Sequence, residues 1–172
     1  VEGVYVPSLY DVSYQDDGLI AEVTPNDDAA PGRVTRRVLQ QLEPTLTKPI
    51  VPNMEVVHDR ATVEIQRGCT QGCRFCQAGM IYRPTRERSV EEVVQAAGEL
   101  LANTGYDELS LMSLSTTDHR EIAPMVNALM DAYGDRGLKI SIPSTRVDSF
   151  SVDIADAVAR GKKHTLTVAP EA

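Results

Sequence analysis

The residues best suited to chemistry are three cysteines in one short stretch. They are the chain's only cysteines, and Cys69, Cys73 and Cys76 are spaced Cys-x3-Cys-x2-Cys. Thiolates are soft ligands that hold zinc or iron–sulfur clusters. An odd number of clustered thiols is a poor disulfide framework, so the stretch indicates a metal or redox site in a reducing compartment.

Two kinds of metal site compete for these cysteines. Three thiolates on one loop can hold three irons of a cubane cluster and leave the fourth iron open to a small molecule. Gly68 and Gly72 would let the backbone turn around such a cluster. A structural zinc would need a fourth ligand from an acid or from His58, His119 or His164, and typical zinc sites carry two Cys-x2–4-Cys pairs. One triplet favours the cluster, and a zinc-stabilised binding module without redox chemistry is the alternative.

The elements around the cysteines alternate regularly. Residues 61–66 alternate as a strand does, and Ser89 and Glu92 predict a capping box at the start of a helix that ends at Gly105. This alternation implies parallel strands covered by crossover helices, although the pattern alone does not separate a doubly wound sheet from part of a (β/α) barrel. The remaining expected elements are strands at 109–114, 138–142 and 164–169 and helices at 119–133 (with Pro124 in its first turn or at a kink) and 152–160.

The first sixty residues differ from the rest. Two strand-like runs at 10–14 and 19–23 flank Asp16-Asp17-Gly18 and predict a hairpin. A short helix is expected over 33–42, and the prolines at 44, 49 and 52 predict an extended connector. We therefore expect an N-terminal appendage or interdomain linker over 1–60 and an incomplete α/β domain over 61–172.

Composition excludes several classes of protein. The chain has 172 residues, 17 Lys+Arg against 25 Asp+Glu and a net charge of −8. No apolar run approaches the roughly 20 residues that a membrane-spanning helix needs. The acidic balance does not support broad contact with a nucleic-acid backbone. The first residue is Val1 and the chain stops after an apolar run, so we expect a fragment of a longer cytoplasmic protein.

The cysteine stretch carries a specific resemblance. Cys69, Cys73 and Cys76, with Phe75 before the last of them, match the signature of the radical S-adenosylmethionine (SAM) enzymes. The longer stretch from Arg67 to Arg88 resembles a poorly characterised group of these enzymes that often has an upstream cobalamin-binding-type domain. That resemblance implies a partial (β/α) barrel, here truncated after about four parallel strands, with the site at the C-terminal ends of the strands.

The resemblance also implies SAM contacts at the strand ends. Phe75 belongs to the cysteine signature, and Ser113 and Ser115 follow the second strand, where the family usually carries a Gly-Gly-Glu-like segment that holds the SAM amino group. This departure leaves an alternative, in which the segment caps the next helix, as Asp118 would do well. Arg146 would pair with the SAM carboxylate or, alternatively, with Asp148.

Three further expectations concern residues at the margin of this site. Glu171, after the fourth strand, is a candidate for the SAM ribose. His119 and His164 are expected to be ordinary surface or packing residues. The arginines at 83, 86 and 88 form either a solvated loop or a contact to an anionic substrate.

The function implied by the resemblance is reductive cleavage of SAM to a 5′-deoxyadenosyl radical that abstracts hydrogen from an unknown substrate. The cofactors would be a [4Fe–4S] cluster and SAM, with cobalamin possible only through a domain outside this chain. No catalytic residue is assigned beyond the three cluster ligands. The partners would be SAM, the substrate and an electron donor such as flavodoxin or ferredoxin. We expect residues 1–172 alone to be inactive.

Overall fold

The computed structural model describes residues 2–149, 151–160 and 167–170. Contacts divide the chain into two compact units, Val1–Gln40 and Gln41–Ala172. The division falls earlier than the boundary at residue 60 that the sequence suggests.

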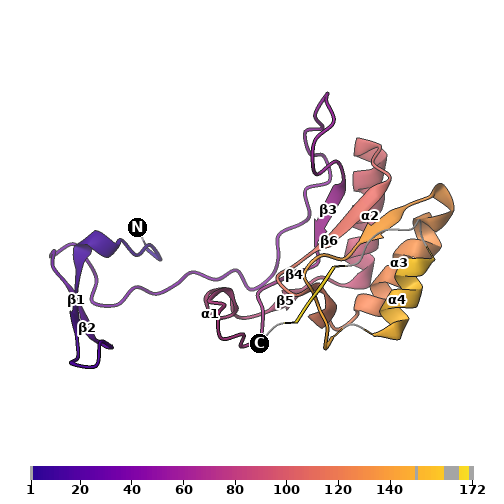
Figure 1. Cartoon of the computed structure of the whole chain (residues 1–172). Helices are drawn as coiled ribbons and strands as arrows, with labels where there is room; N and C mark the ends of the chain where they lie inside the picture. Colours follow the sequence, from indigo (N-terminus) through magenta and orange to yellow (C-terminus); the bar gives the residue numbers. More distant parts are fainter. Residues whose placement is uncertain (1, 150, 161–166, 171–172) are drawn as a thin grey trace. The chain divides into compact units, whose positions relative to one another are not determined.

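The first unit is built on the expected hairpin (Figure 1). A 3₁₀ turn, η1 (Pro7–Leu9), leads into β1 (Tyr10–Tyr14), which pairs antiparallel with β2 (Ile20–Pro25). The Tyr10 hydroxyl donates a hydrogen bond of 2.8 Å to the Pro31 carbonyl and so fixes the following loop. All of β2 is exposed to solvent within this structure.

The helix expected over 33–42 is absent, and this expectation was wrong. No residue in that range is helical. Leu39, which would lie on the apolar face, is 51% exposed. A helix of about ten residues is marginal in water unless it packs its apolar face against something, because nucleation is costly. Val34 and Val38 of this segment are only half-buried, so an apolar helical face is not fully covered here.

The second unit is centred on a parallel sheet of three strands in the order β3-β6-β7. Its strands are β3 (Ala61–Glu64), β6 (Glu108–Met112) and β7 (Lys139–Ser141). Ala61 pairs with Leu109, and Leu109 pairs in turn with Ile140. The side chains of Val63, Leu109 and Leu111 are completely buried, so the sheet forms the centre of the core. The expectation of parallel strands is confirmed.

Three helices lie together on one side of these strands (Figure 1). They are α2 (Val90–Thr104), α3 (Ile122–Tyr133) and α4 (Val152–Ala159). The capping box of α2 is present, since Ser89 Oγ accepts a hydrogen bond from Glu92 N–H and the Glu92 carboxylate accepts one from Ser89 N–H. Gly105 ends α2 in the left-handed conformation, and Pro124 lies in the first turn of α3. The observed alternation of strands and helices therefore agrees closely with the alternation predicted from the sequence.

Smaller elements complete the unit and carry the site. They are β4 (Gln66–Arg67), α1 (Ala78–Ile81), β5 (Arg86–Glu87), η2 (Thr116–Asp118), η3 (Gly134–Arg136), β8 (Thr145–Arg146) and β9 (Val168–Ala169). β4 pairs antiparallel with β5, and β8 pairs parallel with β9. The described strands form part of a β/α arrangement and no closed barrel. Of the strand expected at 164–169, the described part includes β9, which pairs with β8 and not with β3, β6 or β7. Among the described residues the central parallel sheet therefore has three strands, where about four were expected.

Candidate iron–sulfur and cofactor site

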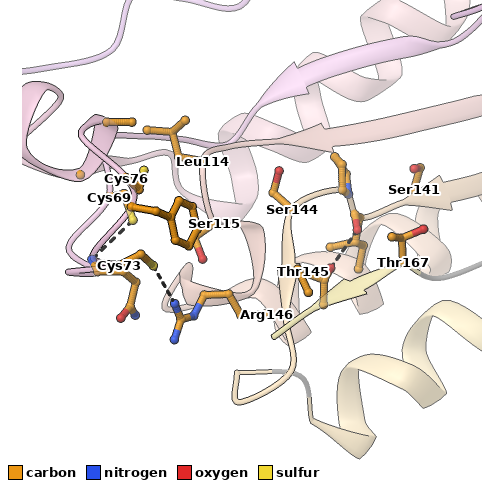
Figure 2. A pocket seen from close by; sticks show the side chains of 17 residues that line it. Cys69, Cys73, Cys76, Leu114, Ser115, Ser141, Ser144, Thr145, Arg146 and Thr167 are labelled. Carbon is orange, nitrogen blue, oxygen red and sulfur yellow. Dashed lines mark hydrogen bonds between the residues drawn. The ribbon is translucent and has the colours of Figure 1, made fainter. Parts of the chain in front are cut away.

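All three cysteines line one cavity of about 460 Å³ in the second unit. Cys69 and Cys73 are half-buried and Cys76 is exposed, and all three thiols are free. Figure 2 shows them at one end of the cavity, opposite residues from the ends of β7 and β8. The other lining residues are Gln71, Phe75, Ala78, Gly79, Leu114, Ser115, Ser141, Ile142, Pro143, Ser144, Thr145, Arg146, Thr167 and Ala169.

The cysteine loop is shaped by close backbone packing at Gly68. Gly68 has φ +95°, and a Cβ at this position would lie 2.5 Å from the Tyr82 carbonyl oxygen. Only glycine combines that conformation with such a close approach. Gly72 is different, since it has no positive φ and a Cβ there would meet nothing within 4 Å. Of the two glycines singled out in the sequence, only Gly68 is required by the backbone.

Hydrogen bonds reach two of the sulfur atoms. The Gln71 backbone N–H donates to Cys69 Sγ at 3.4 Å, and Arg146 Nη1 donates to Cys73 Sγ at 3.5 Å. These contacts bring a backbone dipole toward Cys69 Sγ and a positive charge toward Cys73 Sγ, and hydrogen bonds of this kind orient and tune metal ligands. The loop thus presents its sulfurs in a setting that suits metal ligation.

The thiols do not converge on a single point. In the described residues, no three His, Cys, Asp or Glu side chains form a ready-made group for one metal ion. Tetrahedral zinc with Zn–S bonds of ~2.3 Å needs its sulfurs roughly 3.8 Å apart. A cubane cluster instead spreads three thiolates over three irons. Three thiolates on one loop thus have the chemistry to hold a cluster in which each binds a different iron.

Arg146 lies in the cavity and also pairs with Asp148. Its Nε donates to Asp148 Oδ1 at 3.1 Å and its Nη2 to Oδ2. These hydrogen bonds lower the pKa of the Asp148 carboxyl from its ordinary value of 3.8 and raise that of Arg146. The pair is therefore ionised at neutral pH. Arg146 therefore lines the cavity and at the same time forms the ion pair with Asp148 that the sequence offered as the alternative.

Ser115 and Ser113 differ in their surroundings. Ser115 lines the cavity, is only 2% exposed, and its hydroxyl has no partner among the described residues. A buried hydroxyl without a partner costs free energy, so it marks a place where a ligand group or water would bind. Ser113 is not a lining residue; its hydroxyl donates to Thr116 Oγ1 and accepts from the Ser115 backbone N–H.

The remaining predicted positions have these outcomes. Phe75 lines the cavity and is 73% exposed. Glu171 and His164 lie outside the described residues. His119 is a packing residue, because its ring is buried, Nδ1 accepts from Glu121 N and Nε2 donates to the Arg88 carbonyl.

The three arginines after the cysteines all donate hydrogen bonds to backbone carbonyls. Arg83 donates to the Thr70 carbonyl and Arg86 to the Tyr82 carbonyl. Arg88 is buried and donates to the carbonyls of Glu64 and Glu43. The third of these arginines is therefore part of the core rather than of a solvated loop.

Sequence reasoning missed two features of the site. Asp118 does not cap α3; its carboxylate accepts a hydrogen bond of 3.0 Å from the Gln71 side chain. Ser144 adopts φ +56° between β7 and β8, and its carbonyl accepts from Thr116 N. For the contact between Gln71 and Asp118, the available signal in the sequence was the position of Gln71 between two cysteines. For the turn at Ser144, the signal was the pair Pro143-Ser144 directly after a strand.

Comparison with known proteins agrees with this geometry. The model of the radical SAM superfamily matches residues 63–172. An uncharacterised protein of Methanocaldococcus jannaschii is 36% identical over 110 residues, which cover 64% of this chain and 23% of that protein. The ribosomal protein uS12 methylthiotransferase RimO of Prochlorococcus marinus (strain AS9601) is 29% identical over 119 residues, 64% of this chain and 24% of that protein.

The chain thus spans about a quarter of the length of these curated relatives. None of the helices in the described part of the chain has the length and apolarity that a membrane span needs. The family model covers more than half of the chain and includes the cysteine loop and the strands that follow it. The chain belongs to the radical SAM superfamily.

Proposed function

We propose that Cys69, Cys73 and Cys76 hold a [4Fe–4S] cluster that works with SAM, and that residues 61–172 form the N-terminal part of a partial barrel around it. The observation that carries this proposal is the shared cavity, in which three free thiols face the ends of parallel strands. Active sites of parallel β/α folds lie at the C-terminal ends of the strands. When bound, the cluster supplies one electron to the SAM sulfonium, which yields methionine and a 5′-deoxyadenosyl radical for hydrogen abstraction.

The chain's own residues would prepare the cavity for this chemistry. Ser115 offers a buried, unpartnered hydroxyl to a polar group of SAM. Phe75 and Leu114 provide apolar surface in the wall of the cavity. The tight turn at Gly68 fixes the direction in which the cysteine loop leaves the sheet. Glu171 stays a proposal for the SAM ribose, on the resemblance alone.

The reductant would be a flavodoxin- or ferredoxin-class donor, since the family needs an external electron source. Such donors and a low-potential cluster are compatible with the reducing cytoplasm that we propose for the protein. Cys76 is the most exposed of the three thiols and would lie toward the solvent side of the site.

The alternative proposal, a zinc-stabilised non-catalytic module, makes a different chemical prediction. We would reconstitute the full protein anaerobically with iron and sulfide, reduce it with dithionite, and record electron paramagnetic resonance spectra with and without SAM. A reduced four-iron signal that changes on adding SAM is expected. Stoichiometric zinc without an iron signal would overturn the proposal, and a cluster signal indifferent to SAM would withdraw the SAM contacts.

Single Cys→Ala variants sharpen this test. Each of the three should lower iron content and abolish the SAM-dependent change, because each thiolate binds a different iron. The matched control is Ser13→Ala, which removes a hydroxyl from the exposed face of β1 in the first unit. It should leave iron content unchanged. Full iron content in any one cysteine variant would remove that cysteine from the ligand set.

A further inference from the structure

Arg146 has a partner for each nitrogen of its guanidinium group. Nε and Nη2 donate to the two carboxylate oxygens of Asp148. Nη1 donates to Cys73 Sγ at 3.5 Å (Figure 2). The side chain is only 13% exposed, whereas that of Asp148 is 67% exposed. The carboxylate therefore occupies one edge of the guanidinium, and the sulfur lies at the other end.

The backbone around Arg146 holds this arrangement in place. The Arg146 N–H donates to Thr117 Oγ1 at 3.4 Å, and β8 pairs with β9 through Arg146 and Ala169. Thr117 Oγ1 in turn contacts Ser149 Oγ at 2.5 Å. The left-handed turn at Ser144 starts β8 and sets the direction of the strand. Several independent contacts thus place one cation beside one cysteine.

A cation beside a cluster ligand has a predictable effect. Reduction adds one negative charge to an iron–sulfur cluster, and hydrogen bonds and charges near its sulfurs set the reduction potential. A guanidinium that donates to a ligand sulfur stabilises the reduced form more than the oxidised form. The ionised Asp148 opposes this effect, because its negative charge balances part of the charge of Arg146.

We propose that Arg146 is a positioning residue that donates to Cys73 Sγ and raises the reduction potential of the cluster, with Asp148 moderating the effect, rather than a clamp for the SAM carboxylate. This inference rests on the proposed function. The affected step is the transfer of one electron from a reduced flavodoxin- or ferredoxin-class donor to the cluster. The donor is oxidised by one electron, no bond breaks and no proton is transferred.

The experiment measures the midpoint potential of the full, reconstituted protein by an anaerobic redox titration followed by electron paramagnetic resonance. In Arg146→Met, the equilibrium constant for reduction should fall about tenfold, which is a shift of roughly −59 mV for a one-electron couple. Asp148→Asn should move the potential in the opposite direction. Arg146→Lys keeps the charge and should stay closer to wild type than Arg146→Met.

The matched control is Arg74→Met. Arg74 is exposed and lies next to Cys73 in sequence, so this variant also removes one positive charge near Cys73 but leaves the contact from Arg146 to Sγ in place. The midpoint potential of the cluster should shift much less in Arg74→Met than in Arg146→Met. Equal shifts in the two variants would overturn the proposal, because only distant charge would then matter. If Arg146→Met does not assemble a cluster, the test depends on Asp148→Asn. A midpoint potential of Asp148→Asn that is equal to or lower than that of wild type would then overturn the proposal.

Binding of SAM separates the two roles of Arg146. The affinity of the oxidised protein for SAM should change less than threefold in Arg146→Met. A loss of tenfold or more at unchanged potential would make Arg146 a carboxylate clamp and overturn the inference. Failure of the wild-type protein to form any cluster would instead overturn the proposed function, so the two failures are distinguishable.

Discussion

The Gln71 side-chain amide donates a hydrogen bond of 3.0 Å to the Asp118 carboxylate, across 47 positions of sequence. Gln71 lies between Cys69 and Cys73, and Asp118 ends η2 just beyond β6. The contact ties the cysteine loop to the end of the neighbouring parallel strand. It thus joins the proposed ligands to the scaffold that must hold them in position.

Removing the acceptor of this hydrogen bond should loosen the cysteine loop. In Asp118→Ala, reconstituted protein should lose iron to a chelator several times faster, because a net loss of ~1 kcal/mol corresponds to roughly a fivefold change. Asp118→Asn retains an acceptor oxygen and should behave like wild type. Asp16→Ala, in the hairpin turn of the first unit, is the control. Equal rates of iron loss in Asp118→Ala and wild type would contradict this prediction.

Local signals in the sequence predicted most of the second unit. The capping box at Ser89 and Glu92 and the stop at Gly105 fix the bounds of α2, because they satisfy backbone groups within one turn. The spacing of the cysteines likewise predicted one shared site, and the three thiols do line one cavity. These features depend on residues close in sequence, so a pattern can reveal them.

The features that the sequence did not reveal depend on distant partners. Asp118 looks like a helix cap until Gln71 is placed beside it. Arg88 looks like a surface charge until the carbonyls of Glu64 and Glu43 are seen around it. The segment 33–42 has helical spacing, but its apolar residues are only half-buried or exposed, and it is not helical. Tertiary contacts decide each of these cases.

Gly68 and Gly72 offer a matched pair of substitutions in the cysteine loop. Gly68→Ala should destabilise the second unit by more than ~1 kcal/mol, because of its left-handed φ and the 2.5 Å approach of a Cβ to the Tyr82 carbonyl. Gly72→Ala should be within about 0.5 kcal/mol of wild type, since its Cβ meets nothing within 4 Å. Chemical denaturation of the apo full protein measures both. A neutral Gly68→Ala would show that the loop does not need this turn.

The buried Arg88 should anchor the connector that contains Glu43. Arg88→Met leaves two backbone carbonyls without their donor and should cost about 1–3 kcal/mol of stability. Hydrogen exchange should then increase near residues 43–47 more than in α3. Arg74→Met, at an exposed arginine, is the control for loss of positive charge. Unchanged exchange at the connector in Arg88→Met would rule out the anchoring role.

Glu64 should make stability depend on pH in the acid range. Arg67 donates two hydrogen bonds to its carboxylate, at 2.8 and 2.6 Å, and these lower the pKa of Glu64 from its ordinary value of 4.5. Because the pKa is lower in the folded state, this carboxylate stabilises the fold above pH 4.5 and loses that contribution as pH falls below it. The free energy of unfolding of wild type should therefore fall toward that of Glu64→Gln between pH 6 and pH 3, which chemical denaturation at each pH measures. A constant difference for Glu64→Gln over the same range would show that the ion pair with Arg67 contributes no net stability.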